Sequence, residues 1–171
     1  MLPNDPLRVT PTDLLAVTTL SIKIMPRSIR RITSPAGTEQ LRELLSALPT
    51  DARIEDDDAA RHMPAMAALQ ETTKSLLGRN PWVTASKLCA RKRPHLFPVR
   101  DRLVLKLLEL TPDYARNWAV FAGILRDSNI AARLDEVIAE AIDRGAHLDD
   151  PGLRLRHLDV ILWMHAAKAV R

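Results

Sequence analysis

The chain has 171 residues, 46% of them hydrophobic and 27% charged, which is typical of one globular domain with a single core. No apolar run approaches the roughly 18–20 residues that span a bilayer, and the N-terminus lacks the basic-then-apolar pattern of a secretory signal. The single cysteine, Cys89, excludes an internal disulfide. We therefore expect a cytoplasmic protein with no membrane partner.

Helical periodicity and helix-breaking residues predict an all-α fold of seven or eight helices. A Thr10 cap followed by Pro11 marks the first helix start, and Pro26 is expected to end that helix. The later helices are predicted at about residues 38–48, at 64–77, in a segment that ends at Pro94, at 99–110, at 114–126, at 130–144, and from 153 towards the C-terminus.

The predicted domain organisation is an N-terminal extension, residues 1–9, followed by a single compact helical domain, residues 10–171. Only residues 21–24 hint at the period-2 alternation of a strand. Aromatic residues make up 4% of the chain, so the core is expected to be aliphatic. The few aromatic side chains at helical spacing are predicted to pack in that core: Trp118, Phe121 and Trp163.

The charges are unevenly distributed, because residues 87–106 contain seven cationic side chains and one carboxylate, Asp101. This segment carries +6, and since the whole chain carries +4, the remaining residues sum to −2. A concentrated basic segment indicates an anionic partner, whereas a solvated helix surface is the alternative. Clustered Lys and Arg side chains contact nucleic-acid phosphates. The candidate nucleic-acid-binding residues are Lys87, Arg91, Lys92, Arg93, Arg100, Arg102 and Lys106.

The motifs that the sequence lacks exclude several chemistries. There is no P-loop, no G-x-G-x-x-G and no G-x-S-x-G, so nucleotide hydrolysis and α/β-hydrolase chemistry are not expected. The five histidines show no metal-ligand spacing, and the acidic run at residues 55–58 lacks the pattern of a calcium loop. We expect this run to be a solvated loop, and we expect neither a metal nor a cofactor.

Two blocks of the sequence resemble a family of uncharacterised bacterial proteins of an actinobacterial type. They are WVTASKLCARKRPHLFPVRDRLV at residues 82–104 and RLRHLDVILWM at residues 154–164. In that family a block of the form TASKLLARKRP, followed by P-V-x-D, precedes an LDV-x-LWM block. The stretch DLLAVTTLSIKI at residues 13–24 also fits, so the resemblance extends from about residue 10 to the end of the chain. It implies a family but no known activity.

More distantly, the first block is similar to the helix-hairpin-helix DNA glycosylase superfamily. In that superfamily a glycine-containing hairpin precedes a K-T-A triplet and a P-V-D segment whose aspartate is catalytic. The sequences VTA at residues 83–85 and PVRD at residues 98–101 stand at the corresponding places. The resemblance implies a helix-hairpin-helix glycosylase-like fold, and it makes Asp101 the candidate catalytic carboxylate.

The block also departs from the glycosylase pattern. Arg79 and Pro81 replace the two hairpin glycines whose backbone N–H groups approach a phosphate, and proline has no N–H. Val83 replaces the lysine that forms a Schiff base, so lyase chemistry is not expected. Arg100 shifts the aspartate by one residue. Asp101 lies near a predicted helix start, where it is expected to be ionised and to act either as a structural charge partner or as a catalytic carboxylate.

The function favoured by the sequence is non-catalytic binding of nucleic acid, DNA before RNA, through a helix-hairpin-helix-like basic surface. One alternative is a monofunctional DNA glycosylase-like enzyme that uses Asp101 on a flipped base. The other is a protein-interaction module whose basic helix binds an acidic partner. Nucleic-acid binding differs from the second alternative in its steep, log-linear weakening with salt.

Overall fold

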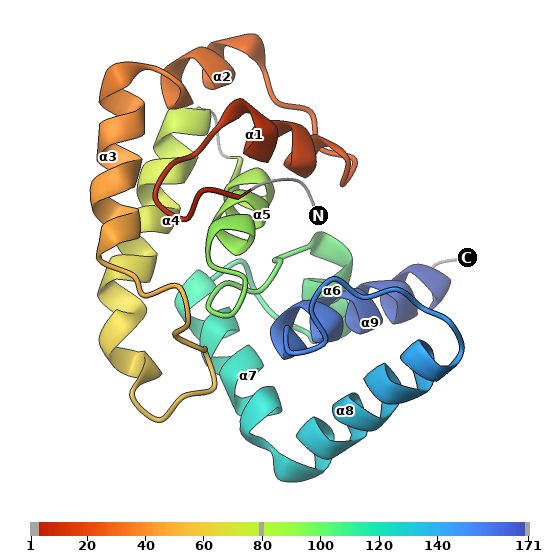
Figure 1. Ribbon diagram of the computed structural model, residues 1–171. Helices are drawn as coiled ribbons and strands as arrows, with labels where there is room; N and C mark the ends of the chain where they lie inside the picture. Colours follow the sequence, from red (N-terminus) through yellow and green to blue (C-terminus); the bar gives the residue numbers. More distant parts are fainter. Residues whose placement is uncertain (1–3, 79–80, 170–171) are drawn as a thin grey trace.

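The computed structural model describes residues 4–78 and 81–169, and within these ranges its regular structure consists of helices alone (Figure 1). The predicted all-α class is therefore confirmed, whereas the predicted number of seven or eight helices is too low, because the described residues form nine α-helices. The helices within the described ranges are α1 (Pro11–Thr18), α2 (Pro26–Ile32), α3 (Pro35–Ser46), the short 3-10 helix η1 (Ala59–His62), α4 (Met63–Leu77), α5 (Trp82–Lys92), α6 (Arg102–Leu107), α7 (Tyr114–Arg126), α8 (Ser128–Asp143) and α9 (Arg154–Ala169).

Local side-chain caps set most helix starts. At α1 the backbone N–H of Thr10 donates to Oδ2 of Asp13 at 2.8 Å, and the N–H of Asp13 donates back to the Thr10 hydroxyl at 3.4 Å. This capping box follows the predicted start, with Pro11 in the first turn. The starts of α6, α7 and α8 are each capped by an aspartate: Asp101, Asp113 and Asp127.

Helix α2 is the main departure from the predicted helices. The prediction of one helix from Thr10 to Pro26 is wrong, because α1 ends at Thr18 and Pro26 begins α2 instead of ending α1. Between them Ser21 has a φ of 59°, in the left-handed region that no α-helix contains. Proline fits the first turn of a helix as well as it ends one, and this accounts for the error. Residues 21–24 form no strand.

Helix α5 lies between α1 and α4, and α4 in turn packs against α2 and α3 (Figure 1). The later helices form a second group, in which α9 packs against α6, α7 and α8. One hydrophobic core runs through both groups and includes Leu45 of α3, Leu88 of α5 and Phe121 of α7. Helix α5, which carries the first part of the basic segment, is therefore an interior element.

The predicted aromatic core is correct for Trp118 and Phe121, which are both buried. Phe97 meets Trp118 edge to face at a centroid distance of 5.5 Å. The prediction is wrong for Trp163, which is 48% exposed. Trp163 lies outside the buried stripe of α9, which consists of Leu155, Leu158, Asp159 and Ala166.

Candidate functional site

The seven basic side chains of residues 87–106 do not form one exposed surface. Arg102 and Lys106 of α6 are exposed, and Arg91 is half-buried. The other four are buried: Lys87, Lys92, Arg93 and Arg100. A buried charge persists only where other groups pair with it or accept its hydrogen bonds, so the contacts of these four side chains define what they do.

Asp13 of α1 holds two cations of α5 in the interior. Its carboxylate is buried, with Oδ1 2.7 Å from Nε of Arg91 and Oδ2 3.0 Å from Nζ of Lys92. Burial opposes ionisation of this group, but hydrogen bonds from the backbone of Thr10 and from Lys92 outweigh it, so the pKa of Asp13 is lowered. The charged cluster therefore fastens α1 onto α5.

Lys92 and Arg93 also bind backbone carbonyl oxygens that precede α1 and follow α3. Lys92 donates to the carbonyl oxygen of Arg8 at 2.8 Å. Arg93 donates to the carbonyl oxygens of Pro6 at 2.7 Å and of Leu48 at 2.9 Å. These contacts tie the N-terminal segment and the end of α3 to the end of α5. Because the hydrogen-bond acceptors of Arg93 among the described residues are neutral carbonyl oxygens, none of them offsets its positive charge.

Arg100 has a similar internal role in the second half of the basic segment. Its Nε donates to Oδ1 of Asn117 at 2.9 Å, and its NH2 group donates to the carbonyl oxygen of Pro112 at 2.6 Å. The guanidinium carbon lies 5.1 Å from the ring centroid of Trp82 and 5.9 Å from that of Tyr114. Arg100 therefore joins the start of α5 to the start of α7.

The candidate catalytic residue Asp101 is the N-cap of α6. Its Oδ1 accepts the backbone N–H of Leu103 at 3.0 Å, and its Oδ2 lies 3.7 Å from Nζ of Lys87. Lys87 also donates to the carbonyl oxygen of Leu20 at 3.2 Å, so one ammonium group links α5, the end of α1 and the start of α6. These contacts give Asp101 a structural role, and its catalytic role stays a prediction.

A second basic surface, which the sequence analysis did not single out, lies on and just before α2. It comprises Lys23, Arg27, Arg30 and Arg31, which we call the α2 basic surface. Between Asp13 and Glu39 the chain contains these four cations and no carboxylate. Lys23, Arg27 and Arg30 are exposed, and Arg31 is half-buried. The acid-free stretch is visible in the sequence, but its charge density is lower than that of residues 87–106.

The α2 basic surface is held against the last turn of α4. The Ser28 hydroxyl donates to the carbonyl oxygen of Leu77, and NH1 of Arg31 donates to that of Ser75 at 3.3 Å. Helix α3 begins in close contact with α2, since a Cβ atom at Gly37 would lie 2.1 Å from the carbonyl oxygen of Arg31. Any larger residue there would push α2 and α3 apart. The contacts with α3 and α4 therefore fix the position of α2, and the cations of α2 lie beside the end of α4.

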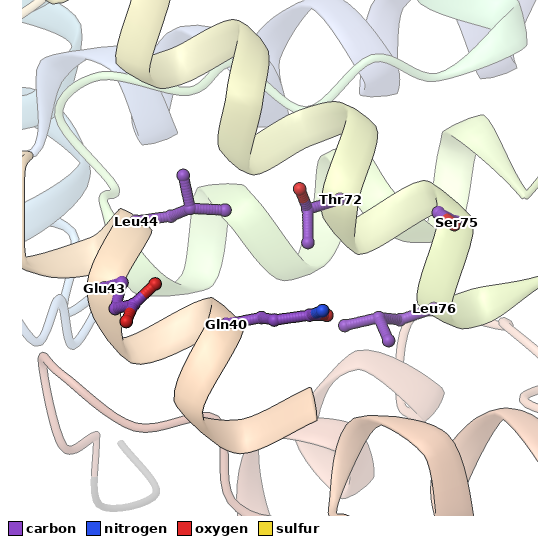
Figure 2. Close-up of a pocket in the computed structure, with 6 residues that line it drawn as sticks. All are labelled: Gln40, Glu43, Leu44, Thr72, Ser75 and Leu76. Carbon is purple, nitrogen blue, oxygen red and sulfur yellow. The ribbon is translucent and has the colours of Figure 1, made fainter. Parts of the chain in front are cut away.

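The candidate residues from the sequence lie largely outside two hollows in the surface of the described residues. One hollow lies between α3 and α4, with side chains of both helices facing it, and none of the candidates lines it (Figure 2). A second hollow lies near the N-terminal segment and includes Lys92 and His95. Asp101 lines neither of them. The lining residues of the first are Gln40, Glu43, Leu44, Thr72, Ser75 and Leu76.

Asp159 of α9 is a buried carboxylate beside the basic segment. Its Oδ2 accepts the backbone N–H of Val99 at 2.9 Å and lies 3.2 Å from NH1 of Arg156. Its Oδ1 has no hydrogen-bond partner among the described residues. Burial raises the pKa of Asp159 to about 7, against the opposing effects of Arg156 and of the Val99 N–H. The group joins α9 to the segment that leads into α6.

A comparison with protein-family models finds a match over almost the whole chain. A protein-family model, described as a family of unknown function (DUF6308), matches residues 2–166. This range contains both sequence blocks on which the resemblance to an uncharacterised family rests. No curated protein and no solved structure matches the chain. Within the part of the chain that the structure describes, no helix is both long and apolar enough to cross a bilayer.

Proposed function

Since the chain belongs to the DUF6308 family of unknown function, its function has to be inferred from its own surface, and we propose that it is a non-catalytic nucleic-acid-binding protein. The α2 basic surface supplies its principal phosphate contacts. The observation that carries this proposal is the exposure of Lys23, Arg27 and Arg30 in a stretch of chain without any carboxylate. Exposed cations without neighbouring acids are the groups that neutralise phosphates and release counterions.

The position of α2 supports the same proposal. Its contacts with Ser75 and Leu77 place it at the end of α4, next to the connection between α4 and α5. In the helix-hairpin-helix superfamily the corresponding connection binds the nucleic-acid backbone through glycines that Arg79 and Pro81 replace in this chain. The resemblance is also the reason to test DNA before RNA. Arg79, which replaces a hairpin glycine, lies outside the described residues.

The buried cations of residues 87–106 support the proposal through the electrostatic potential that they create. Arg93 donates to neutral oxygens, so its charge adds to the electrostatic potential around the molecule, whereas the charge of Arg100 is partly offset by Asp113 and Glu71. Such a potential attracts a polyanion and raises its association rate. Arg102 and Lys106, the exposed members of the segment, are candidates for further phosphate contacts.

Glycosylase chemistry is the weaker alternative, because both oxygens of Asp101 already have structural partners. One accepts the Leu103 N–H, and the other faces Lys87. A flipped base needs a pocket that surrounds it, and Asp101 lines neither the hollow between α3 and α4 nor the hollow near the N-terminal segment. Binding of an acidic protein through the same cations is the other alternative, and the salt dependence and ligand type of the test below distinguish it.

The test is a charge reversal on α2. The variant Arg27→Glu/Arg30→Glu removes two cations and adds two anions on exposed positions. Affinity for a fluorescein-labelled duplex, measured by anisotropy at about 50 mM salt, is expected to fall by at least two orders of magnitude, since each phosphate contact adds to a steep electrostatic term. Single-stranded DNA and RNA of equal length are measured in parallel.

The matched control is Arg116→Glu/Lys168→Glu. It makes the same change in net charge at exposed positions, one in the first turn of α7 and one in the last turn of α9, as Arg27 and Arg30 are placed in α2. We expect its affinity to stay within a fewfold of the parent. Equal losses of DNA affinity in both variants would show that net charge alone accounts for the effect. A parent that binds acidic peptides but no nucleic acid would support the interaction-module alternative.

A further inference from the structure

Exposed aliphatic side chains lie next to the cations of the α2 basic surface. Met25, immediately before the first residue of α2, is 63% exposed, the highest value among the exposed large hydrophobic residues of the described chain. Ile29 is also exposed and lies one turn after Met25, which is the N-cap of α2 and has an extended backbone. Single exposed apolar side chains are common on protein surfaces, and Met25 and Ile29 are candidates for contact with a ligand because exposed cations lie next to them in the chain.

The cations of α2 form a stripe on a different side of the helix from Ile29. Arg27 and Arg30 are three residues apart and therefore share a face. Helical spacing separates this face from the buried side chains of Ser28 and Ile32, which point to the rest of the protein. Lys23, Arg27 and Arg30 are all exposed and lie within five residues of Met25 in the chain, so a ligand as large as a DNA duplex that reaches Met25 also meets these positive charges.

The apolar pair is held in place before any ligand binds. Pro26 fixes the backbone directly after Met25, and the contacts of Ser28 with Leu77 and of Arg31 with Ser75 keep α2 against α4. Because the backbone of α2 is already ordered, insertion of the Met25 side chain into a ligand costs little additional backbone conformational entropy.

We propose that Met25, supported by Ile29, is an apolar wedge that enters the minor groove of duplex DNA while the α2 cations hold the flanking phosphates. Such a wedge rests on the proposed nucleic-acid binding of the α2 basic surface and names duplex DNA as its ligand. Apolar side chains inserted at a base step unstack it and kink the duplex away from the protein. Pyrimidine–purine steps such as TA deform most easily, so duplexes with these steps are preferred.

Other polyanions fit this arrangement less well. Single strands bind on aromatic platforms on which bases stack, and Met25 and Ile29 offer none. A helix that lies in a membrane interface needs a long apolar face, whereas α2 has seven residues and one of its faces is already packed on α4. A wedge, in contrast, needs only one or two apolar side chains beside cations.

The test uses the full chain and a duplex of about 20 base pairs with central TA steps and a fluorescent donor and acceptor at its two ends. The parent is expected to bring the ends closer, which raises energy transfer at saturation. Met25→Ala is expected to abolish this rise and to weaken binding about tenfold, because it removes the inserted apolar group and leaves every cation in place. Met25→Leu is expected to restore both.

Leu15→Ala is the matched control, since Leu15 of α1 is 60% exposed and lies outside the α2 basic surface. It is expected to bend and bind DNA as the parent does. Tight binding by the parent without a change in energy transfer, or equal bending by Met25→Ala, would overturn the wedge and leave the proposed function standing. Binding to vesicles of anionic lipid in preference to duplex DNA, or no binding to any nucleic acid, would overturn both.

Discussion

Lys92 and Asp13 form an ion pair inside the protein, with Nζ of the lysine 3.0 Å from Oδ2 of the aspartate and both side chains almost fully buried. The most basic part of the sequence therefore stabilises the folded interior, and only some of its cations lie on the surface. Removing one partner of a buried pair leaves an uncompensated charge, which costs about 3–5 kcal/mol, whereas exposed cations contribute little.

Replacement of Lys92 should accordingly act on stability. We expect Lys92→Ala to lower the free energy of unfolding by about 3–5 kcal/mol, because Asp13 then keeps only Arg91 as a partner among its two cations of α5. Urea unfolding followed by circular dichroism measures this change. Lys106→Ala, on the exposed side of α6, serves as the control and should stay within about 0.5 kcal/mol of the parent. Equal effects at the two positions would contradict the structural assignment of Lys92.

Asp101 should behave as a helix cap. Asp101→Ala removes the acceptor of the Leu103 N–H and is expected to cost about 1 kcal/mol of unfolding free energy. Asp101→Asn keeps an acceptor oxygen and should remain close to the parent, with DNA affinity equal or slightly higher because one negative charge is lost.

Base release from a lesion-containing duplex separates the cap from the catalytic alternative. Any release by the parent that Asp101→Asn reduces by orders of magnitude, with binding unchanged, would support the glycosylase alternative. Release that persists in this variant would remove Asp101 from catalysis.

The helical class could be predicted from the sequence because apolar residues at helical spacing and helix-breaking residues are local signals. The capping box of Thr10 and Asp13 illustrates this, since both partners lie within one helical turn. The start of α2 was missed because Pro26 can end a helix or begin one, and only the left-handed backbone at Ser21 decides between the two. Such a backbone angle has no clear signature in a serine.

The candidate site was harder to predict than the fold, because burial depends on residues distant in sequence. Lys92 looks like a surface cation until Asp13, 79 residues earlier, is placed beside it. Arg100 is likewise enclosed by Trp82 and Tyr114, which come from two different helices. In contrast, Arg27 and Arg30 have no acids nearby in the sequence, and they are exposed as their local sequence suggests.

Asp159 should make stability decrease as pH rises towards neutrality. Burial raises its pKa from 3.8 to about 7 in the folded protein, so between these values the folded state holds a proton that the unfolded state has released. This contribution is fully present below about pH 4 and is lost as pH rises through 7. His95 acts in the opposite direction, because burial and nearby Arg53 lower its pKa from 6.5.

The variant Asp159→Asn isolates the contribution of Asp159. It keeps an acceptor for the Val99 N–H and cannot ionise. Urea midpoints are measured at pH 5 and pH 8 for parent and variant, and we expect the variant to gain stability relative to the parent at pH 8. A parent-to-variant difference that is the same at both pH values would contradict the raised pKa.

Cys89 should be unreactive in the folded protein. Burial raises the pKa of its thiol to about 12, with a smaller opposing effect from the Thr73 hydroxyl, so the thiolate is scarce at neutral pH. A colorimetric thiol reagent is expected to modify Cys89 quickly in about 8 M urea and at least a hundredfold more slowly in buffer. Rapid modification of the folded chain would show that α5 is accessible from solvent.

The most direct test of the proposed function is the salt dependence of DNA binding by the parent and by Arg27→Ala/Arg30→Ala. Affinity for the same duplex is measured by anisotropy between about 50 and 200 mM salt, and the slope of log affinity against log salt is compared. If the α2 basic surface contacts phosphates, the double alanine variant binds more weakly and its slope is smaller by about two, one for each lost contact. Equal affinities and equal slopes for the folded parent and variant would contradict phosphate binding by α2.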